Sequence, residues 1–192
     1  MKHVKPTNLI VICAPSGTGK TTLLARLKVD RPQLNWSVSC TTRPIRPGEK
    51  DGVDYHYIDK SDFEPRIGEN EFIEGALVRS NYHRTSQKFV EQGLSTGKAL
   101  LFDLDVQGSD SMKRLYGDKA RVIFIQPPSL EELGKRLRGR GTDAEHVIVE
   151  RLNNARKEIA RAKDFDFLVT NDDMERAYQE LIGIIDNLLG GH

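Results

Sequence analysis

An apolar run that leads directly into a glycine-rich loop is the feature that most constrains this fold. Residues 9–13 (LIVIC) are continuously apolar, residues 14–21 (APSGTGKT) follow, and a helical pattern begins at Lys20. A loop of this kind between a strand and a helix lets backbone N–H groups close around phosphate oxygens. The sequence therefore predicts a β-strand, a phosphate-binding loop and a helix, which is the signature of a nucleoside triphosphate site.

The side chains of this loop each suit a triphosphate. Lys20 neutralises the β- and γ-phosphates, and Thr21 can place its hydroxyl on Mg²⁺. Ala14 stands where a glycine is usual, and a small residue keeps the corner compact if its φ stays negative. The residues predicted to bind the nucleoside triphosphate here are Ala14, Pro15, Ser16, Gly17, Thr18, Gly19, Lys20, Thr21 and Thr22.

The rest of the chain favours an α/β fold built on a parallel sheet. Short β-rich runs at 99–104, 121–125 and 168–170 are almost continuously apolar, as strands covered on both faces are. Helical patterns cover 86–96, 130–138, 144–163 and 173–189. In the last of these the apolar residues expected in the core are Met174, Ala177, Leu181, Ile184, Ile185 and Leu188.

Length and charge limit the possible partners. With 192 residues the chain suits one core with insertions. A net charge of +1 does not favour nucleic acid as the main partner, and no apolar stretch reaches the ~18 residues of a membrane span. Cys13 and Cys40 allow one disulfide, but two reduced thiols are the simpler interpretation. We therefore expect a soluble, unprocessed, cytoplasmic protein with no nucleic acid or membrane partner, whose oligomeric state stays open.

A second anion site is indicated in the segment from residue 39 to residue 96, which has the composition of an inserted, partly β lobe. Arg43 and Arg46 lie three apart in a turn interrupted by Pro44 and Pro47. Two guanidinium groups held in this way can grip one phosphate from two sides. A solvated basic loop is the alternative, because surface arginines are common.

The chain resembles the guanylate kinase family along most of its length. The motifs that carry the resemblance are residues 14–21 (APSGTGKT), 37–43 (SVSCTTR), 48–49 (GE) with Gly52 and Tyr55, 71–74 (EFIE), 103–108 (DLDVQG), 136–141 (RLRGRG) and 171–173 (NDD). The resemblance implies phosphoryl transfer from ATP to GMP with Mg²⁺, with dGMP as a further possible acceptor. It also implies a P-loop core (1–38, 97–130 and 152–192), a mixed α/β GMP-binding lobe (39–96) and a small helical lid (131–151).

For the acceptor nucleotide, the resemblance places the phosphate contacts on Arg43, Arg46 and Tyr55. Its guanine contacts fall on Ser39, Glu74, Thr85 and Asp105. The chemistry agrees, because a carboxylate can accept from the N1–H and the amine of guanine, whereas adenine lacks the N1–H.

For the donor nucleotide, Asp103 is expected to hold Mg²⁺ together with Thr21, directly or through water. The resemblance implies transition-state roles for Lys20 and for the lid arginines Arg136, Arg140 and Arg151, which taken alone would be solvated charges. Asn171 matches an adenine-binding turn, although Asn-Asp-Asp before a helix is also a common N-cap.

The chain departs from the family pattern at His83 and Arg84, where a tyrosine and a glycine are usual. His83 can still donate to phosphate, and Arg84 either adds a third cation or points to solvent. Two other functions stay open: a non-catalytic guanylate-kinase-like module that binds protein, and a kinase of the same fold with a different phosphorylated acceptor. The presence of Lys20 and Asp103 argues against the first.

Overall fold

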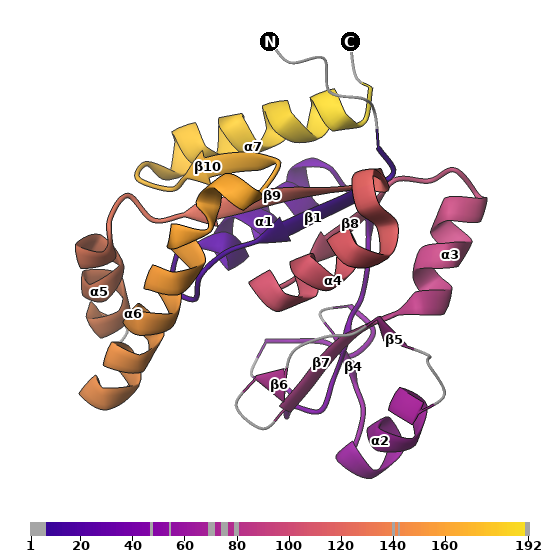
Figure 1. Ribbon diagram of the computed structural model, residues 1–192, viewed down its shortest axis with the longest axis horizontal. Coiled ribbons are helices and arrows are strands. Elements are labelled where there is room, and N and C mark those ends of the chain that lie inside the picture. The colour runs from indigo at the N-terminus through magenta and orange to yellow at the C-terminus, as the bar shows by residue number, and fades with distance from the viewer. Residues whose placement is uncertain are drawn as a thin grey trace.

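A parallel sheet of five strands, in the order β10-β9-β1-β8-β2, organises the described part of the chain (Figure 1). The computed structural model describes residues 7–46, 48–53, 55–68, 72–73, 77–78, 81–139, 141 and 143–190. The strands of this sheet are β1 (Leu9–Cys13), β2 (Asn35–Trp36), β8 (Leu100–Asp103), β9 (Ala120–Gln126) and β10 (Phe167–Thr170).

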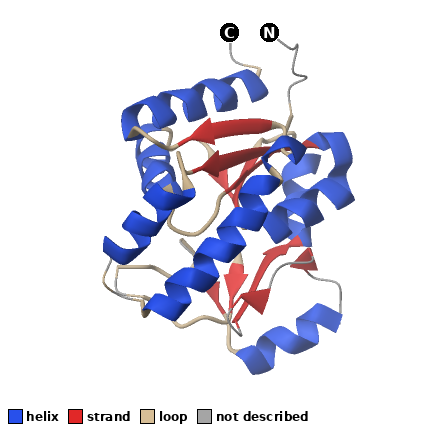
Figure 2. Cartoon of the chain, turned by 60° about the vertical axis from the view of Figure 1, so that its left-hand side comes forward, coloured by secondary structure: helices blue, strands red, loops and turns tan. Residues whose placement is uncertain are grey.

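The central strand β1 is buried on both faces, which explains its unbroken apolar run. Ile10 and Ile12 belong to a cluster formed with α1 (Lys20–Asp30) and α7 (Met174–Leu188). Val11 and its alternate neighbours belong to a second cluster, formed with α3 (Gln87–Ser95) and α4 (Val106–Tyr116). Helices therefore cover the sheet on both sides, as the turned view shows (Figure 2).

A second sheet forms the lower part of the molecule in Figure 1. Its strands are β3 (Cys40–Thr41), β4 (His56–Tyr57), β5 (Phe72–Ile73), β6 (Leu77–Val78) and β7 (Asn81–Ser86). Here α2 (Lys60–Gly68) contributes Phe63, whose ring stacks on Phe72 at 4.7 Å and on Tyr82 at 5.3 Å between centroids. This part of the chain thus has a small core of its own.

Two helices project to the left of the core in Figure 1: α5 (Leu130–Gly139) and α6 (Glu145–Ala160). They pack on each other through Leu133, Leu137, Ile148 and Ala155. Two 3₁₀ turns, η1 (Gly117–Lys119) and η2 (Ala162–Asp164), follow α4 and α6.

The predicted fold class is confirmed, and each strand and helix expected from residues 9–13, 99–104, 121–125, 168–170 and the four helical patterns is present within a few residues. The structure corrects the prediction for α7 in one place. Met174 is 38% exposed, whereas Tyr178, which the pattern did not single out, is 1% exposed. Helices α2 and α4 were not predicted.

Both cysteines, Cys13 and Cys40, are buried, and neither forms a disulfide with the other. Among the described residues, no helix combines the length and the apolar character needed to span a bilayer.

Candidate active site

The phosphate loop leaves the N-terminus of α1 open. Gly19 precedes the helix with a φ of 101° and has no side chain to cap it. Among the described residues, the backbone N–H groups of Gly17, Gly19, Lys20 and Thr21 meet no hydrogen-bond acceptor. Unpaired N–H groups at the positive end of a helix dipole attract anions. This end of α1 can therefore receive phosphate oxygens.

Lys20 and Asp103 form an ion pair beside this loop. The Lys20 Nζ lies 2.6 Å from Asp103 Oδ1 and donates to the Leu104 carbonyl at 2.5 Å. Asp103 ends β8 opposite Ile12 of β1, so the sheet register brings the carboxylate to the lysine. The pair presents a cation and an anion at the carboxyl edge of the sheet, where ligands of parallel α/β folds bind.

The oxygen donors near the loop suit Mg²⁺ when they are combined with phosphate. Thr21 is exposed at the start of α1, and the Asp103 carboxylate is 38% exposed. No group of three or more metal-ligating side chains occurs in the part of the chain that the structure describes. A hard cation that keeps several waters and takes phosphate ligands fits such a sparse donor set.

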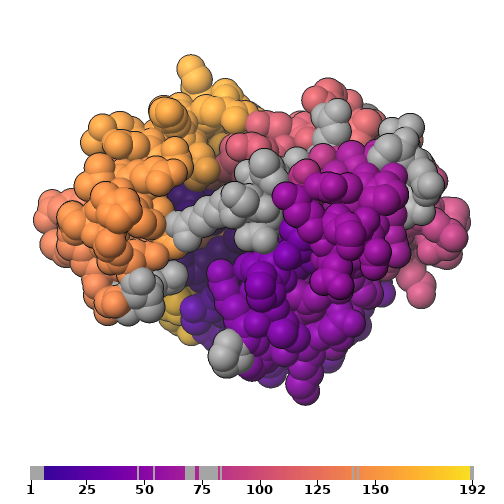
Figure 3. All heavy atoms as spheres, turned by 90° about the horizontal axis from the view of Figure 1, so that it is seen from below, coloured from indigo at the N-terminus to yellow at the C-terminus, as the bar shows by residue number. Residues whose placement is uncertain are grey.

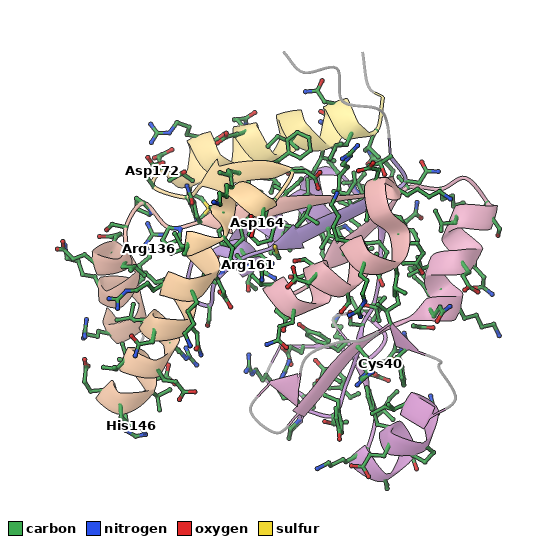
Figure 4. All side chains as sticks on the ribbon, in the orientation of Figure 1. Cys40, Arg136, His146, Arg161, Asp164 and Asp172 are labelled. Carbon is green, nitrogen blue, oxygen red and sulfur yellow. The ribbon has the colours of Figure 1, made fainter. Side chains whose placement is uncertain are left out.

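Two side chains hydrogen-bond to the backbone of the phosphate loop: Asn171, and Arg136 of α5, which Figure 4 labels. The Asn171 Nδ2 donates to the Thr18 carbonyl at 2.7 Å, and the Arg136 guanidinium reaches the same oxygen at 3.4 Å. Arg136 also donates to the Asn171 carbonyl at 3.0 Å. The side chain of Asn171 is thus committed to the loop, and the N-cap of α7 is Asp173.

The two loop glycines allow this close packing. A Cβ on Gly17 would lie 2.7 Å from Leu137 Cδ2, and a Cβ on Gly19 would lie 2.4 Å from Asn171 Nδ2. Both distances are well below ordinary contact, so a larger residue would push the loop off its support.

Ser39 and Thr85, both expected to contact guanine, come together in the second sheet. Their hydroxyl oxygens lie 3.4 Å apart, and both residues are buried. Asp105, another expected guanine contact, accepts a hydrogen bond from the Gly108 N–H at 2.7 Å as the N-cap of α4. This cap uses Oδ1, and among the described residues the other carboxylate oxygen accepts no hydrogen bond.

Arg43 is held by the carboxylate of Glu49, a residue of the 48–49 motif to which the sequence analysis assigned no role. The two terminal nitrogens of Arg43 donate to Glu49 Oε2 and Oε1 at 3.0 and 2.9 Å. The guanidinium also lies 5.4 Å from the centre of the Tyr55 ring. Arg46 is exposed, and its backbone N–H donates to Glu49 at 2.8 Å. The sequence signal that could have indicated this contact is the position of Glu49, three residues after Arg46 in a proline-rich turn.

Tyr55 connects the two halves of the site. Burial, followed by the negative charge of Asp103, raises the pKa of the Tyr55 hydroxyl to about 12. The Tyr55 hydroxyl therefore stays protonated at neutral pH and can donate a hydrogen bond. Seen from below, a hollow opens between the α5–α6 pair and this lobe, with N-terminal residues at its floor (Figure 3).

The remaining predicted residues divide into two groups. Arg151 pairs with Asp143 at 3.0 Å, and both side chains are largely buried. Glu74 and Arg140 lie outside the described residues, and of His83 only the backbone is described, opposite Thr41.

Arg84 lies opposite Cys40 in β7. Because side chains alternate along a strand, Arg84 shares a face with Tyr82, which packs in the cluster around Phe63, and not with Thr85. This register separates Arg84 from the hydroxyl pair of Ser39 and Thr85.

Comparisons with known proteins agree with this arrangement. The sequence matches the guanylate kinase family over residues 6–188. A guanylate kinase of Aromatoleum aromaticum is 45% identical over 180 residues, covering 94% of this chain and 88% of that protein. A guanylate kinase of Chlorobaculum tepidum is 46% identical over 169 residues, covering 88% of this chain and 86% of that protein. The crystal structure of guanylate kinase from Anaplasma phagocytophilum aligns with a TM-score of 0.72 at 30% identity, covering 96% of this chain and 86% of that one. The chain belongs to the guanylate kinase family.

Proposed function

We propose that this protein is a guanylate kinase that transfers the γ-phosphoryl group of ATP to GMP, giving ADP and GDP. The observation that carries this proposal is the presence of two cationic groups, Lys20 beside the open end of α1 and Arg43 beside the Tyr55 ring in the lobe. In-line transfer between two nucleotides requires two such groups to face each other.

On the donor side, the N–H groups of the loop and Lys20 bind the β- and γ-phosphates, while Asn171 and Arg136 hold the loop in shape. Thr21 and Asp103 would hold Mg²⁺, which neutralises charge on the transferring group. Arg136, Arg140 and Arg151 are proposed to stabilise the transition state from the lid. For Arg136 and Arg151 this role requires lid closure that exchanges their present partners for phosphate.

On the acceptor side, Arg43, Arg46 and Tyr55 are proposed to bind the GMP phosphate, with His83 as a further donor. Ser39, Thr85, Asp105 and Glu74 are proposed to read the guanine edge. Adenine would leave these polar groups unpaired, so discrimination against AMP is expected to reach about 10⁴-fold in kcat/KM.

We also propose the three-part division into a core (1–38, 97–130 and 152–192), a GMP-binding lobe (39–96) and a lid (131–151). The separate clusters around Phe63 and around Leu137 support it. The buried thiols of Cys13 and Cys40 support our proposal that the protein works in the reducing cytoplasm.

An ADP-release assay across GMP, dGMP, AMP, UMP and a sugar phosphate tests the activity. We expect rapid turnover with GMP, slower turnover with dGMP and only trace turnover with AMP. ATP binding without turnover of any acceptor would refute the enzyme and favour a binding module. Preferred turnover of another phosphate ester would refute the assignment of GMP.

A further inference from the structure

Glu49 occupies the centre of the acceptor-side hydrogen-bond network, and the proposed mechanism gives it no role. Its carboxylate accepts from both terminal nitrogens of Arg43, from the backbone N–H of Arg46 and from the Tyr57 hydroxyl, all between 2.8 and 3.0 Å. Three of these bonds fall on Oε2 and one, from Arg43, falls on Oε1. Both carboxylate oxygens are thus engaged with groups of the lobe itself, which fixes the orientation of Glu49.

The same network leaves Arg43 only partly satisfied. A guanidinium has five N–H donors. Two of the Arg43 donors go to Glu49 and a third goes to the Pro44 carbonyl at 2.7 Å. The remaining two have no acceptor among the described residues, and the orientation of the group is set by its bidentate bond to Glu49 and by its position over the rings of Tyr55 and Tyr57.

Glu49 also shapes the turn that carries Arg46. The Glu49 N–H donates to the Arg46 carbonyl at 3.0 Å, while the Glu49 carboxylate accepts from the Arg46 N–H at 2.8 Å. Residues 46 and 49 are thus joined by two hydrogen bonds, one in each direction. The Arg46 side chain is exposed, and its guanidinium has no partner among the described residues. The turn therefore fixes the backbone of Arg46 and leaves its guanidinium able to meet a ligand.

We propose that Glu49 is a positioning residue for the acceptor: it holds Arg43 and the turn of Arg46 in the arrangement that receives the monophosphate. This inference rests on the proposed function. The Arg43 guanidinium, which Glu49 already orders, loses little further side-chain entropy when phosphate arrives, and the fixed backbone of the turn limits where the Arg46 guanidinium can reach. Hydrogen bonds, first of all those from Arg43, also lower the pKa of the Glu49 carboxyl to about 2, so this carboxylate is ionised at neutral pH.

Glu49→Gln tests the proposal, because the amide keeps the shape but replaces one acceptor with a donor that faces Arg43. We expect KM for GMP to rise at least about 10-fold, with KM for ATP and kcat changed by less than about threefold. Tyr57→Phe removes one donor from Glu49, and KM for GMP should then rise in the same direction by about threefold. The control is Glu64→Gln on α2, an exposed glutamate 3.9 Å from Lys60, for which both Michaelis constants should stay unchanged.

The split between the two Michaelis constants separates positioning from loss of structure. A protein that is only less stable loses active fraction, which lowers the apparent kcat and leaves both KM values in place. Turnover by the wild type with an unchanged KM for GMP in Glu49→Gln would overturn the inference alone. If Glu49→Gln does not fold, an unchanged KM for GMP in Tyr57→Phe overturns it. Failure of the wild type to phosphorylate GMP would overturn the proposed function and this inference together.

Discussion

Gly19 is the position in the phosphate loop where the surrounding structure leaves the least room for a side chain. In Gly19→Ala the added Cβ would meet the Asn171 amide nitrogen at 2.4 Å, and the backbone would keep a φ of 101°. Asn171 is 2% exposed and donates to the Thr18 carbonyl at 2.7 Å, so its amide has little room to retreat. We therefore expect the substitution to break this support of the loop.

Two contributions set the magnitude. Holding alanine in the left-handed region costs about 1–2 kcal/mol. Displacing the buried amide from its carbonyl costs a further ~1–3 kcal/mol. Together they predict a loss of about 2–5 kcal/mol in the free energy of unfolding. KM for ATP should rise as well, because the N–H groups that bind phosphate belong to the displaced loop.

Gly97→Ala is the matched control. Gly97 also has a positive φ, of 67°, but nothing lies within 4 Å of the position of its Cβ. Only the backbone cost of about 1–2 kcal/mol applies there. Urea unfolding of both variants, with ATP titration of each, measures the difference that belongs to Asn171.

A double-mutant cycle with Asn171→Ala identifies the contact itself. Removing the amide relieves the clash, so the double variant Gly19→Ala/Asn171→Ala should be more stable than the sum of the single effects predicts, by about 1 kcal/mol or more. Equal losses in Gly19→Ala and Gly97→Ala, or strict additivity in the cycle, would refute this reasoning.

Three further predictions address charge. Lys20→Met should lower kcat at least about 100-fold in the ADP-release assay, because it removes the cation at the transferring phosphoryl group; retained turnover would exclude that role. His83→Tyr combined with Arg84→Gly should change KM for GMP much more than KM for ATP, and equal effects on both would reject a role at the acceptor phosphate. The pKa of Glu49 is lowered to about 2, so its stabilising contribution is present above its unfolded pKa near 4.5 and is lost as pH falls toward 2. In urea unfolding, the stability advantage of wild type over Glu49→Gln should therefore narrow between pH 5 and pH 3, and an advantage that does not change with pH would contradict the ion pair.

The sequence predicted the core well because its signals are local. The run at residues 9–13 is apolar on both faces of a central strand, and the amphipathic pattern of α7 needs no distant partner to be recognised. Helix α4 was missed because Gly108, Ser109 and Ser111 are small or polar, yet all three are buried. Their burial depends on packing against the sheet, which a local pattern does not report.

The candidate site was predicted through its motifs and only partly through its contacts. Ser39 and Thr85 lie 46 positions apart, and only the strand register brings their hydroxyls together. Asn171 supports the Thr18 carbonyl across 153 positions, which no spacing rule could indicate. The roles assigned to Glu74 and Arg140 stay predictions, because these residues lie outside the described part of the chain.

The contact of Gly17 with α5 has a mechanical consequence. Leu137 and Leu133 of α5 occupy the space that a side chain at residue 17 would fill. Moving α5 away from the loop would leave a gap at this contact, whereas rotating the helix about the contact would keep both leucines packed. We therefore expect any closing motion of the α5–α6 pair to be a rotation about the contact between Gly17 and Leu137.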